Sequence, residues 1–352
     1  MDHVLIQTWI DYLQRPYLLN ALFLFAALIL SVAIGAVYIP PASVARFILE
    51  ALSFSPDPEI WSDTMATIVL QLRLPHTILI ALAGAALAAS GAGYQGLFQN
   101  PLADPYLIGV ASGAGLGAVL AMSFNWPNNL LGFFSIPGAA FVGAALAVII
   151  AYRLARFGNV LSPTNLILAG VAVGSFASAL TSFIMLHSEG EVRRAIAWLL
   201  GGSTLTGWAP VIASLPYIVV SLGILIASGY ALNVLQFGDE QAQQLGLPVE
   251  RIKILIILAA SLATATAVSF TGVIGFVGLI VPHLVRILWG PDYRNLIPLS
   301  ILAGATALLI ADLLARILFA PQVVPIGIIT ALAGAPFFLW ILRRSQRGVI
   351  QV

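Results

Sequence analysis

Long apolar stretches recur along the whole chain, separated by short polar segments. Each runs for about 20 residues with few charges, the length that a helix needs to cross the hydrocarbon core of a bilayer. The apolar residues are continuous rather than alternating, which excludes a transmembrane barrel. The pattern predicts an all-α, polytopic membrane protein with ten transmembrane helices, in the ranges 19–39, 75–98, 106–124, 134–155, 164–186, 211–232, 252–271, 274–290, 295–318 and 325–343. The break between the seventh and eighth ranges is weak, so nine or eleven helices are the alternatives.

One polar segment, residues 236–253, interrupts this pattern. It lies between two apolar ranges, so it must sit in water at a membrane face. Ala242, Leu245 and Gly246 recur at helical spacing within it, and Gly246 followed by Pro248 is a typical helix end. The segment is therefore expected to form one or two short helices presented on a membrane surface, with an ordinary solvated loop as the alternative. Its charged residues are Asp239, Glu240, Glu250, Arg251 and Lys253.

Lys and Arg in the loops predict the orientation. With ten crossings both termini share a side, and ten of the 15 Lys and Arg residues collect there. This places the termini and segment 236–253 in the cytoplasm. Five helices in each half make the two halves inverted with respect to each other. The range 19–39 is too long for a signal-peptide core and lacks a small-residue cleavage site after it, so it is expected to be a retained helix.

Composition narrows the function further. Of the 352 residues, 60% are hydrophobic and 8% charged, too few charges to cover a soluble domain of this length. The net charge of +1 argues against a nucleic-acid partner. Cysteine is absent, which excludes disulfides, thiolate nucleophiles and cysteine metal sites. Because no glycine-rich phosphate loop ending in Lys-Ser or Lys-Thr is present, we expect no ATP hydrolysis by this chain and no enzyme activity.

Two predicted helices carry a face of small residues. Gly84, Ala88, Ala92 and Gly96 recur every four positions in the range 75–98, and the next range repeats the pattern with Gly109, Gly113 and Gly117. Such faces let helices approach closely in lipid, where packing drives association. The stretch Gly113-Ala-Gly115 superficially resembles a dinucleotide fingerprint, but it lacks the preceding strand and the following acidic residue, so no cofactor is expected.

Charged residues inside the predicted helices are few and are functional candidates by default. Asp312 and Arg316 lie one turn apart near the outer end of the range 295–318 and can form an ion pair. No chain of acidic residues crosses the bilayer centre, which argues against proton-coupled transport. His187, Glu189 and Glu191 in an outer loop are a weak candidate for metal binding, and we expect no metal site.

Eight stretches, taken in order, resemble one family. Examples are Arg73-Leu-Pro-His76 and Asn100-Pro-Leu-Ala-Asp-Pro105, and the full set is 73–76, 84–91, 100–105, 198–202, 235–246, 275–283, 311–316 and 325–336. Together they resemble the FecCD-type permease subunit of bacterial ABC importers (type II) for iron-siderophores, haem and vitamin B12. The ordered set runs from about residue 20 to residue 345 and is specific, although no single motif decides it.

The resemblance implies several partners. It implies a homodimer, or a pair of related permeases, around a central pathway in the bacterial plasma membrane. It also implies two cytoplasmic ATPase subunits, which use the ATP, and an extracytoplasmic binding protein that delivers the substrate. Segment 236–253 matches the coupling helices of the family. The residues assigned to ATPase coupling are Gly238, Asp239, Glu240, Ala242, Leu245 and Gly246.

The resemblance also assigns residues at the outer face and a gate. Outer arginines of relatives meet glutamates on the binding protein, which assigns docking to Arg73, His76 and Arg316. The family commonly has arginine where this chain has His76, so docking is expected to be weaker or mildly pH-sensitive. Ser162 and Thr164 match the place where the family narrows its pathway, a candidate cytoplasmic gate. The alternative is that Ser162 or Asn165 only caps a helix.

The predicted function is therefore a permease without chemistry of its own, which forms the path for an iron(III)-siderophore complex. The same type of importer carrying haem or vitamin B12 is the main alternative. A stand-alone secondary transporter and a receptor or scaffold are weaker alternatives. In such importers the binding protein supplies the affinity for cargo, so the permease sequence says little about which chelate is carried.

Overall fold

The computed structural model of the chain is helical through almost all of its described length. It describes residues 15–35, 38–44, 65, 67–124, 126, 129–157, 160–188, 191–203, 205–320 and 322–345. Within these residues the only strands form a two-residue ladder, in which β1 (Arg156–Phe157) pairs antiparallel with β2 (Val160–Leu161). The all-α fold predicted from the sequence is confirmed.

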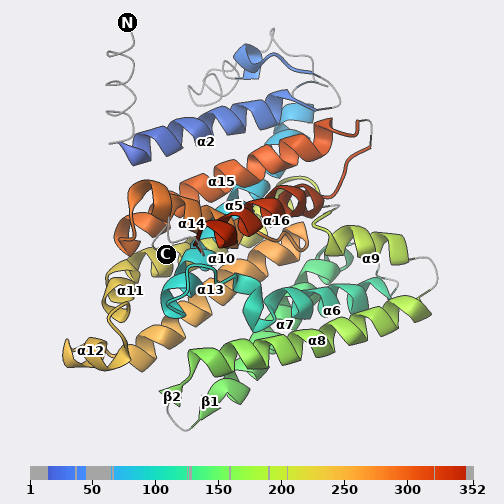
Figure 1. Ribbon diagram of the computed structural model, residues 1–352. Coiled ribbons are helices and arrows are strands. Elements are labelled where there is room, and N and C mark those ends of the chain that lie inside the picture. Colours follow the sequence, from blue (N-terminus) through green and yellow to red (C-terminus); the bar gives the residue numbers. More distant parts are fainter. Residues whose placement is uncertain are drawn as a thin grey trace, which may run out of the picture.

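Figure 1 shows the described helices in chain order. The long ones are α2 (Pro16–Ala33), α5 (Leu74–Leu97), α7 (Leu130–Ala155), α8 (Pro163–His187), α10 (Trp208–Ala227), α13 (Val249–Thr271), α15 (Tyr293–Ile317) and α16 (Ile326–Ser345). The shorter ones are the π-helix η1 (Ile68–Arg73), the 3₁₀-helix η2 (Pro105–Ile108), α6 (Val110–Met122), α9 (Val192–Leu199), α11 (Gly229–Leu235), α12 (Asp239–Gln244) and α14 (Val277–Trp289).

Each of the ten apolar ranges overlaps a helix. Among the described residues, seven helical segments are long and apolar enough to cross a membrane, whereas α6, α14 and α16 contribute apolar stretches that are shorter. Two bounds differ clearly from the prediction: α2 ends at Ala33 rather than 39, and the second helix begins at Ile68 rather than 75. The second begins earlier because η1 continues into α5 without a break. Helix α2 ends early where two arginine side chains bind its last carbonyl groups, as described below.

The two halves of the chain repeat one packing scheme. The third apolar segment of each half is a helix of 13 residues, α6 in the first half and α14 in the second. Each follows a residue with positive φ, Gly109 (85°) before α6 and Phe276 (70°) before α14. Helix α6 packs on α7 and α8 as α14 packs on α15 and α16, and α5 packs on α15 as α13 packs on α7. Because each half contains five apolar segments, the second half starts from the opposite side, and the halves are inverted.

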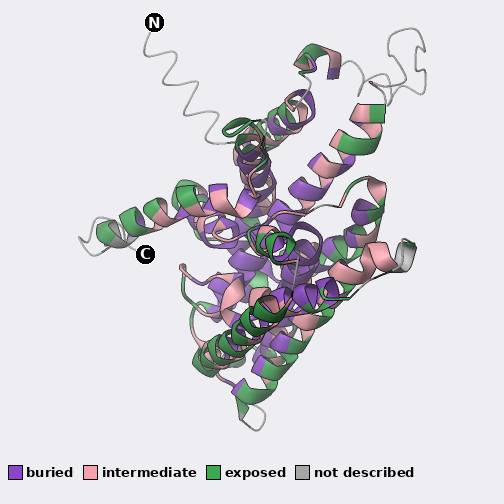
Figure 2. Cartoon of the chain, turned by 90° about the vertical axis from the view of Figure 1, so that its right-hand side faces the viewer, coloured by how far each residue is buried: buried purple, intermediate pink, exposed green. Residues whose placement is uncertain are grey.

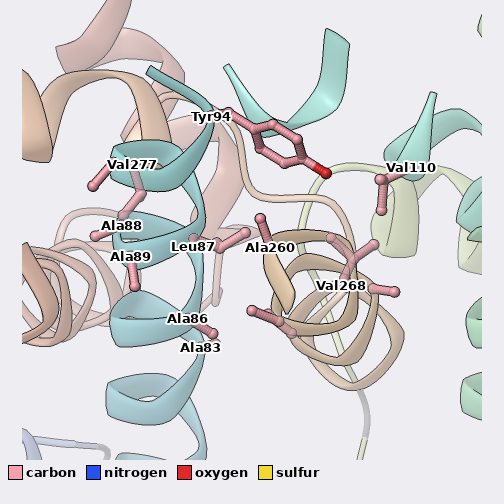
Figure 3. Packing of buried hydrophobic residues seen from close by; sticks show 14 of the residues in the cluster. Ala83, Ala86, Leu87, Ala88, Ala89, Tyr94, Val110, Ala260, Val268 and Val277 are labelled. Carbon is pink, nitrogen blue, oxygen red and sulfur yellow. The ribbon is translucent and has the colours of Figure 1, made fainter. Parts of the chain in front are cut away.

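Helix α5 lies at the centre of the molecule, packed against α13, α14 and α15 (Figure 1). Buried residues gather at this centre, and exposed residues lie on the peripheral helices (Figure 2). Every residue of α5 from Ala83 to Leu97 is buried. Most are small, and Figure 3 shows Leu87 pointing from α5 towards Ala260 of α13. The centre is therefore built from backbones that approach closely rather than from large side chains.

The small-residue faces predicted from the sequence lie at the closest of these contacts. A Cβ atom added at Gly84 would overlap the carbonyl oxygen of Gly304 in α15, and one at Gly304 would overlap Gly84. In α6, an added Cβ atom at Gly113 would overlap the carbonyl oxygen of Gly143 in α7. Backbone lies opposite backbone at these points, so a side chain larger than hydrogen requires the helices to separate.

Gly84→Ala is accordingly expected to destabilise the protein by about 1–3 kcal/mol, the usual cost of overpacking a dense contact. The matched control is Gly223→Ala in α10, where an added Cβ atom meets nothing within 4 Å. That change is expected to leave stability unchanged or raise it slightly, since alanine favours a helix over glycine. Thermal unfolding of both variants in the same detergent tests this expectation. Equal losses in the two variants would contradict it.

Candidate functional site

The polar segment 236–253 folds as a short helix between two longer ones, at one end of the molecule (Figure 1). Helix α12 is bounded by Gly238 (φ 97°) and Gly246 (φ 85°). The Gly246 N–H donates to the Gln243 carbonyl oxygen at 2.9 Å, and the Leu247 N–H donates to that of Ala242 at 3.0 Å. These two bonds are the usual way in which a left-handed glycine ends a helix. The sequence-based expectation of a short helix stopped at Gly246 is confirmed.

The exposed side of this segment carries two large apolar residues. Leu245 exposes 69% of its surface and Phe237 exposes 65%, and Glu240 is exposed beside them. The sequence suggested that Ala242 contacts a partner. In the structure Ala242 is fully buried, so it packs α12 against its own chain. A Cβ atom at Gly246 would have open space around it, so this glycine is required by its backbone conformation rather than by crowding within the chain.

A buried lysine fixes the position of α12. The Lys253 side chain in α13 is 2% exposed, and its Nζ donates to Asp239 Oδ2 at the start of α12. Glu250 Oε1 lies 3.9 Å from the same Nζ. Asp239 is thus engaged within the chain, and 45% of its side chain remains exposed. A buried cation with two carboxylates around it is compensated, and its loss would leave both acids without their partner.

The same network reaches the hairpin of β1 and β2. Glu250 Oε2 accepts a hydrogen bond of 3.2 Å from the backbone N–H of Leu161 in β2. Leu161 directly precedes Ser162, where α8 begins. The polar segment, the start of α13 and the start of α8 therefore lie on one face of the molecule. This proximity joins residues 89 positions apart and was not expected from the sequence.

Ser162 and Thr164 lie at this start of α8. Ser162 Oγ accepts a hydrogen bond of 3.3 Å from the Asn165 N–H, and Pro163 occupies the first helical position. Ser162 therefore caps α8, which was the alternative interpretation of this residue. Thr164 is exposed in the single chain and makes no such bond to the backbone among the described contacts. Thr164 is the more exposed of the two.

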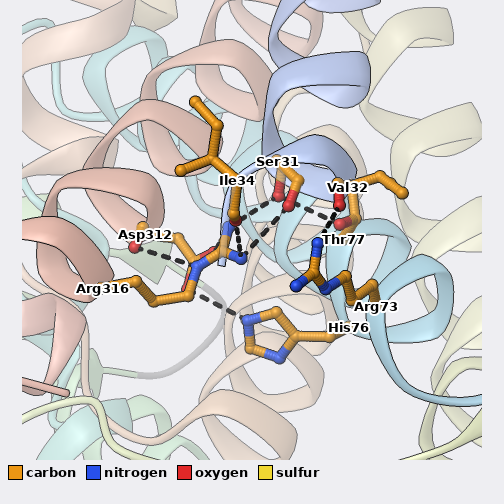
Figure 4. A network of polar contacts seen from close by, with 8 residues as sticks. All are labelled: Ser31, Val32, Ile34, Arg73, His76, Thr77, Asp312 and Arg316. Atoms are coloured by element: carbon orange, nitrogen blue, oxygen red, sulfur yellow. Dashed lines mark hydrogen bonds and ion pairs between the residues drawn. The ribbon is translucent and has the colours of Figure 1, made fainter. Parts of the chain in front are cut away.

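A second polar cluster lies at the start of α5, where α2 and α15 end (Figure 4). Arg73 Nη1 donates to the carbonyl oxygens of Val32 and Ala33, at 2.8 and 3.1 Å. Arg316 Nη1 donates to those of Ser31 and Ile34, at 3.1 and 3.0 Å. Both cations thus bind the last carbonyl groups of α2, where the helix dipole also favours positive charge. These bonds satisfy carbonyl groups at the end of α2, which ends at Ala33 rather than at 39 as the apolar range predicted.

Asp312 completes this cluster. Its carboxylate is 4% exposed and lies 2.8 Å from Arg316 Nη2, which confirms the predicted ion pair one turn apart. Its other oxygen lies 3.0 Å from His76 Nε2. The His76 side chain is 36% exposed and that of Arg316 16%, so His76 is the more accessible of these two residues. The fold brings together the three residues assigned to docking. The two arginines also bind the end of α2, so part of their hydrogen-bonding capacity serves the fold.

The outer loop residues do not assemble into a metal site in the part of the chain that is described. His187 Nδ1 lies 2.9 Å from the Phe183 carbonyl oxygen, and Glu191 lies 3.7 Å from Arg194. Glu189 lies outside the described residues. Among those described, no group of three His, Cys, Asp or Glu side chains is arranged to hold a metal ion.

The sequence profile of the FecCD transport family matches residues 23–344. The chain belongs to the FecCD transport family. The ABC transporter permease YvrB of Bacillus subtilis is 41% identical to this FecCD-family chain, covering 94% of each chain. The cobalamin import system permease of Halobacterium salinarum is 46% identical, covering 81% of this chain and 75% of the relative. The hemin transport system permease of Yersinia pestis is 38% identical, covering 81% and 86%.

A solved structure shares the fold of this FecCD-family chain. It is an inward-facing ABC transporter, with a TM-score of 0.78 and 28% identity, covering 94% of this chain and 99% of that one. With these relatives, and with seven helices that suit a membrane among the described residues, the chain is a multi-pass ABC importer permease.

Two features of this FecCD-family permease were missed by sequence reasoning. Phe237 was read as part of a polar stretch, yet its side chain is exposed next to α12. An aromatic residue inside an otherwise water-facing segment is the signal that could have identified it. Lys253 was counted only as a cytoplasmic charge, and no local pattern indicated its burial.

Proposed function

We propose that two copies of this permease form the membrane path of an ATP-driven importer for an iron(III)-siderophore complex. Two cytoplasmic ATPase subunits bind at segment 236–253, and an extracytoplasmic binding protein delivers the cargo to the outer face. The observation that carries the proposal is the water-facing turn with Leu245 and Phe237 exposed on it. Large apolar side chains at the tip of a polar segment are costly unless another protein covers them.

The proposed dimer is supported by α8. Only 22% of the residues in its 18-residue apolar stretch are buried within the single chain. Its exposed side chains include Leu168, Val171, Phe176, Phe183 and Leu186. Such a helix suits contact with lipid or with a second subunit, and its first turn carries Thr164. Two α8 helices facing each other would place this polar turn at the cytoplasmic mouth of a central path.

The orientation with both termini in the cytoplasm rests on the excess of Lys and Arg on that side. The hydrogen bond between Glu250 and the hairpin supports one shared face for the polar segment and the start of α8. In this orientation the coupling surface and the proposed gate both face the ATPase subunits. The cluster of Arg73, His76 and Arg316 then faces the binding protein, with the part-exposed His76 available for contact.

The cargo has a second candidate. The permease is 46% identical to a cobalamin permease and 36% identical to a ferric citrate permease of Bacillus subtilis. The higher identity to the cobalamin permease favours vitamin B12 as the alternative cargo. Haem follows, on a relative of 38% identity. Uptake of labelled ferric siderophore, cobalamin and haem by vesicles containing the complete importer distinguishes the three. Uptake of ferric siderophore alone would support the first proposal, and uptake of cobalamin alone would replace it with the second.

Dependence on ATPase subunits tests the proposal independently of cargo. We expect the permease to co-purify with the nucleotide-binding subunits when the neighbouring genes are co-expressed. Transport into vesicles should then require ATP on the side of segment 236–253. Transport by the permease alone, driven by an ion gradient, would instead indicate a secondary transporter.

Cysteine cross-linking tests the gate. Thr164→Cys is expected to form a disulfide between subunits in one nucleotide state and not in the others, because the gate opens and closes with the ATPase cycle. Position 164 is preferable to 162, since Ser162→Cys would also remove a helix cap worth about 1 kcal/mol. Cross-linking to the same extent with and without nucleotide, or none at all, would contradict a gate at this position.

A further inference from the structure

A groove opens between α7 and α13 at the end of the molecule that carries the hairpin. Its volume is about 460 Å³, which is within the range of ligand pockets. Its walls are apolar and come from both helices, with Val148 and Ile149 on one side and Ile254 and Leu258 on the other. Leu258 exposes 61% and Ile149 48% of their surfaces, so the groove faces outward from the helix bundle.

The mouth of this groove is cationic. Tyr152 and Arg153 line it from the last turn of α7, and Arg156 lines it from the first position of β1. Both arginines are exposed. No Asp or Glu is among the described residues that line the groove. The site therefore offers two guanidinium groups and a phenol to an anion. Glu250, the carboxylate that touches the hairpin, lies 3.9 Å from Lys253 Nζ and accepts a hydrogen bond from the Leu161 N–H.

The cationic mouth and the apolar walls of the groove lie at different levels along α13, in the order expected at a membrane surface. Glu250 at the first turn of α13 touches the hairpin, and the apolar residues Ile254 and Leu258 follow one and two turns further along α13. The arginines thus lie at the level of the water-facing hairpin, and the apolar walls lie deeper. Cations at an interface above an apolar cleft are the pattern that binds the head group of an acidic lipid.

We propose that this groove binds an anionic phospholipid of the leaflet on the side of segment 236–253. Its phosphate is held by Arg153, Arg156 and Tyr152, and an acyl chain lies against the walls of α7 and α13. The apolar walls favour a lipid over free phosphate, which would leave them uncovered. Charge complementarity favours an acidic head group over a zwitterionic one.

Binding at this place has a structural consequence. Arg156 pairs with Leu161 in the ladder, and Leu161 precedes the first turn of α8. A lipid held by Arg156 therefore restrains the hairpin that leads into α8. If the gate proposed for α8 is correct, anionic lipid is expected to change the ATP-driven transport rate. The binding site itself does not depend on that proposal.

The test uses the purified full-length permease and three probes: phosphatidylglycerol, phosphatidylcholine and inorganic phosphate. Retention of each lipid is measured by native mass spectrometry, for the wild type and for Arg153→Gln/Arg156→Gln. The matched control is Arg343→Gln, an exposed arginine of α16 outside the groove. We expect the double variant to bind phosphatidylglycerol roughly tenfold or more weakly, since each arginine near the surface contributes about 1 kcal/mol. The control should bind as the wild type does.

Three outcomes would overturn the assignment. Unchanged phosphatidylglycerol retention in the double variant, at an unfolding midpoint equal to that of the wild type, would exclude the groove as the site. Equal retention of phosphatidylcholine would show that the head-group charge is irrelevant. Displacement of phosphatidylglycerol by millimolar inorganic phosphate, with equal stabilisation of the protein, would identify free phosphate as the ligand. Lys substitutions at both positions should retain part of the binding, because they keep the charge but lose the forked hydrogen bonds of the guanidinium groups.

Discussion

Leu245→Asp is expected to stop ATP-driven transport while the permease remains folded and inserted. Leu245 is 69% exposed in the single chain, so its replacement removes no internal packing. If an ATPase subunit covers it, the change loses about 1.5–3 kcal/mol of apolar burial and places a carboxylate in an apolar contact. We expect co-purification of the ATPase subunits and transport in vesicles both to fall about tenfold or more.

Leu245→Met is the matched control, since it keeps an apolar side chain of similar volume. It should retain most of the transport. Wild-type coupling in Leu245→Asp would rule out this surface as the contact, because an added charge is harmless only on a solvated loop. A parallel loss of thermal stability would instead assign the effect to folding.

Gly246 separates conformation from contact at the same turn. Its φ of 85° is strained for any residue with a Cβ atom, although the space around it is open within the chain. Gly246→Asp is therefore expected to uncouple transport from ATP hydrolysis, through the altered turn together with crowding against the partner. Gly246→Asn should be tolerated best if conformation dominates, since asparagine adopts this region more readily. Equal loss in both variants would indicate crowding at the contact.

Arg316→Glu is expected to destabilise the permease by about 3–5 kcal/mol, the usual cost of leaving a buried charge without its partner. The new carboxylate would lie beside Asp312, which is 4% exposed, and beside the carbonyl groups of Ser31 and Ile34. The end of α2 would then lose its donors. The unfolding midpoint in detergent and the yield of folded protein measure the effect.

Two variants check the cause. Asp312→Asn added to Arg316→Glu removes the like-charge contact and should restore part of the stability. Arg194→Glu is the matched control, because its ion pair with Glu191 is 3.7 Å long and about half exposed, and such pairs contribute little. A folded, stable Arg316→Glu variant that fails only to bind its extracytoplasmic partner would show that docking, not support of α2, is the main role of Arg316.

Several features followed from the sequence because they depend on neighbouring residues. The apolar ranges predicted where helices form, since the length and continuity of an apolar run decide whether a helix suits lipid. Gly246 and Pro248 predicted the end of α12, because the hydrogen bonds of the left-handed turn join residues within a stretch of six, Ala242 to Leu247. The spacing of Asp312 and Arg316 predicted their ion pair, because residues four positions apart lie one turn apart on the same face of a helix.

Other features were decided by the tertiary structure alone. Arg316 reaches the carbonyl oxygen of Ile34, 282 positions away, at the end of α2. Glu250 reaches Leu161 and joins the coupling segment to the start of α8. The composition of a segment does not reveal such partners, because they depend on which helices pack side by side. The sequence by itself therefore determined the class of protein, its helices and its water-facing segment. The tertiary structure decided which charges stay available to partners, because a guanidinium or an ammonium group binds whichever oxygen the fold brings within about 3 Å.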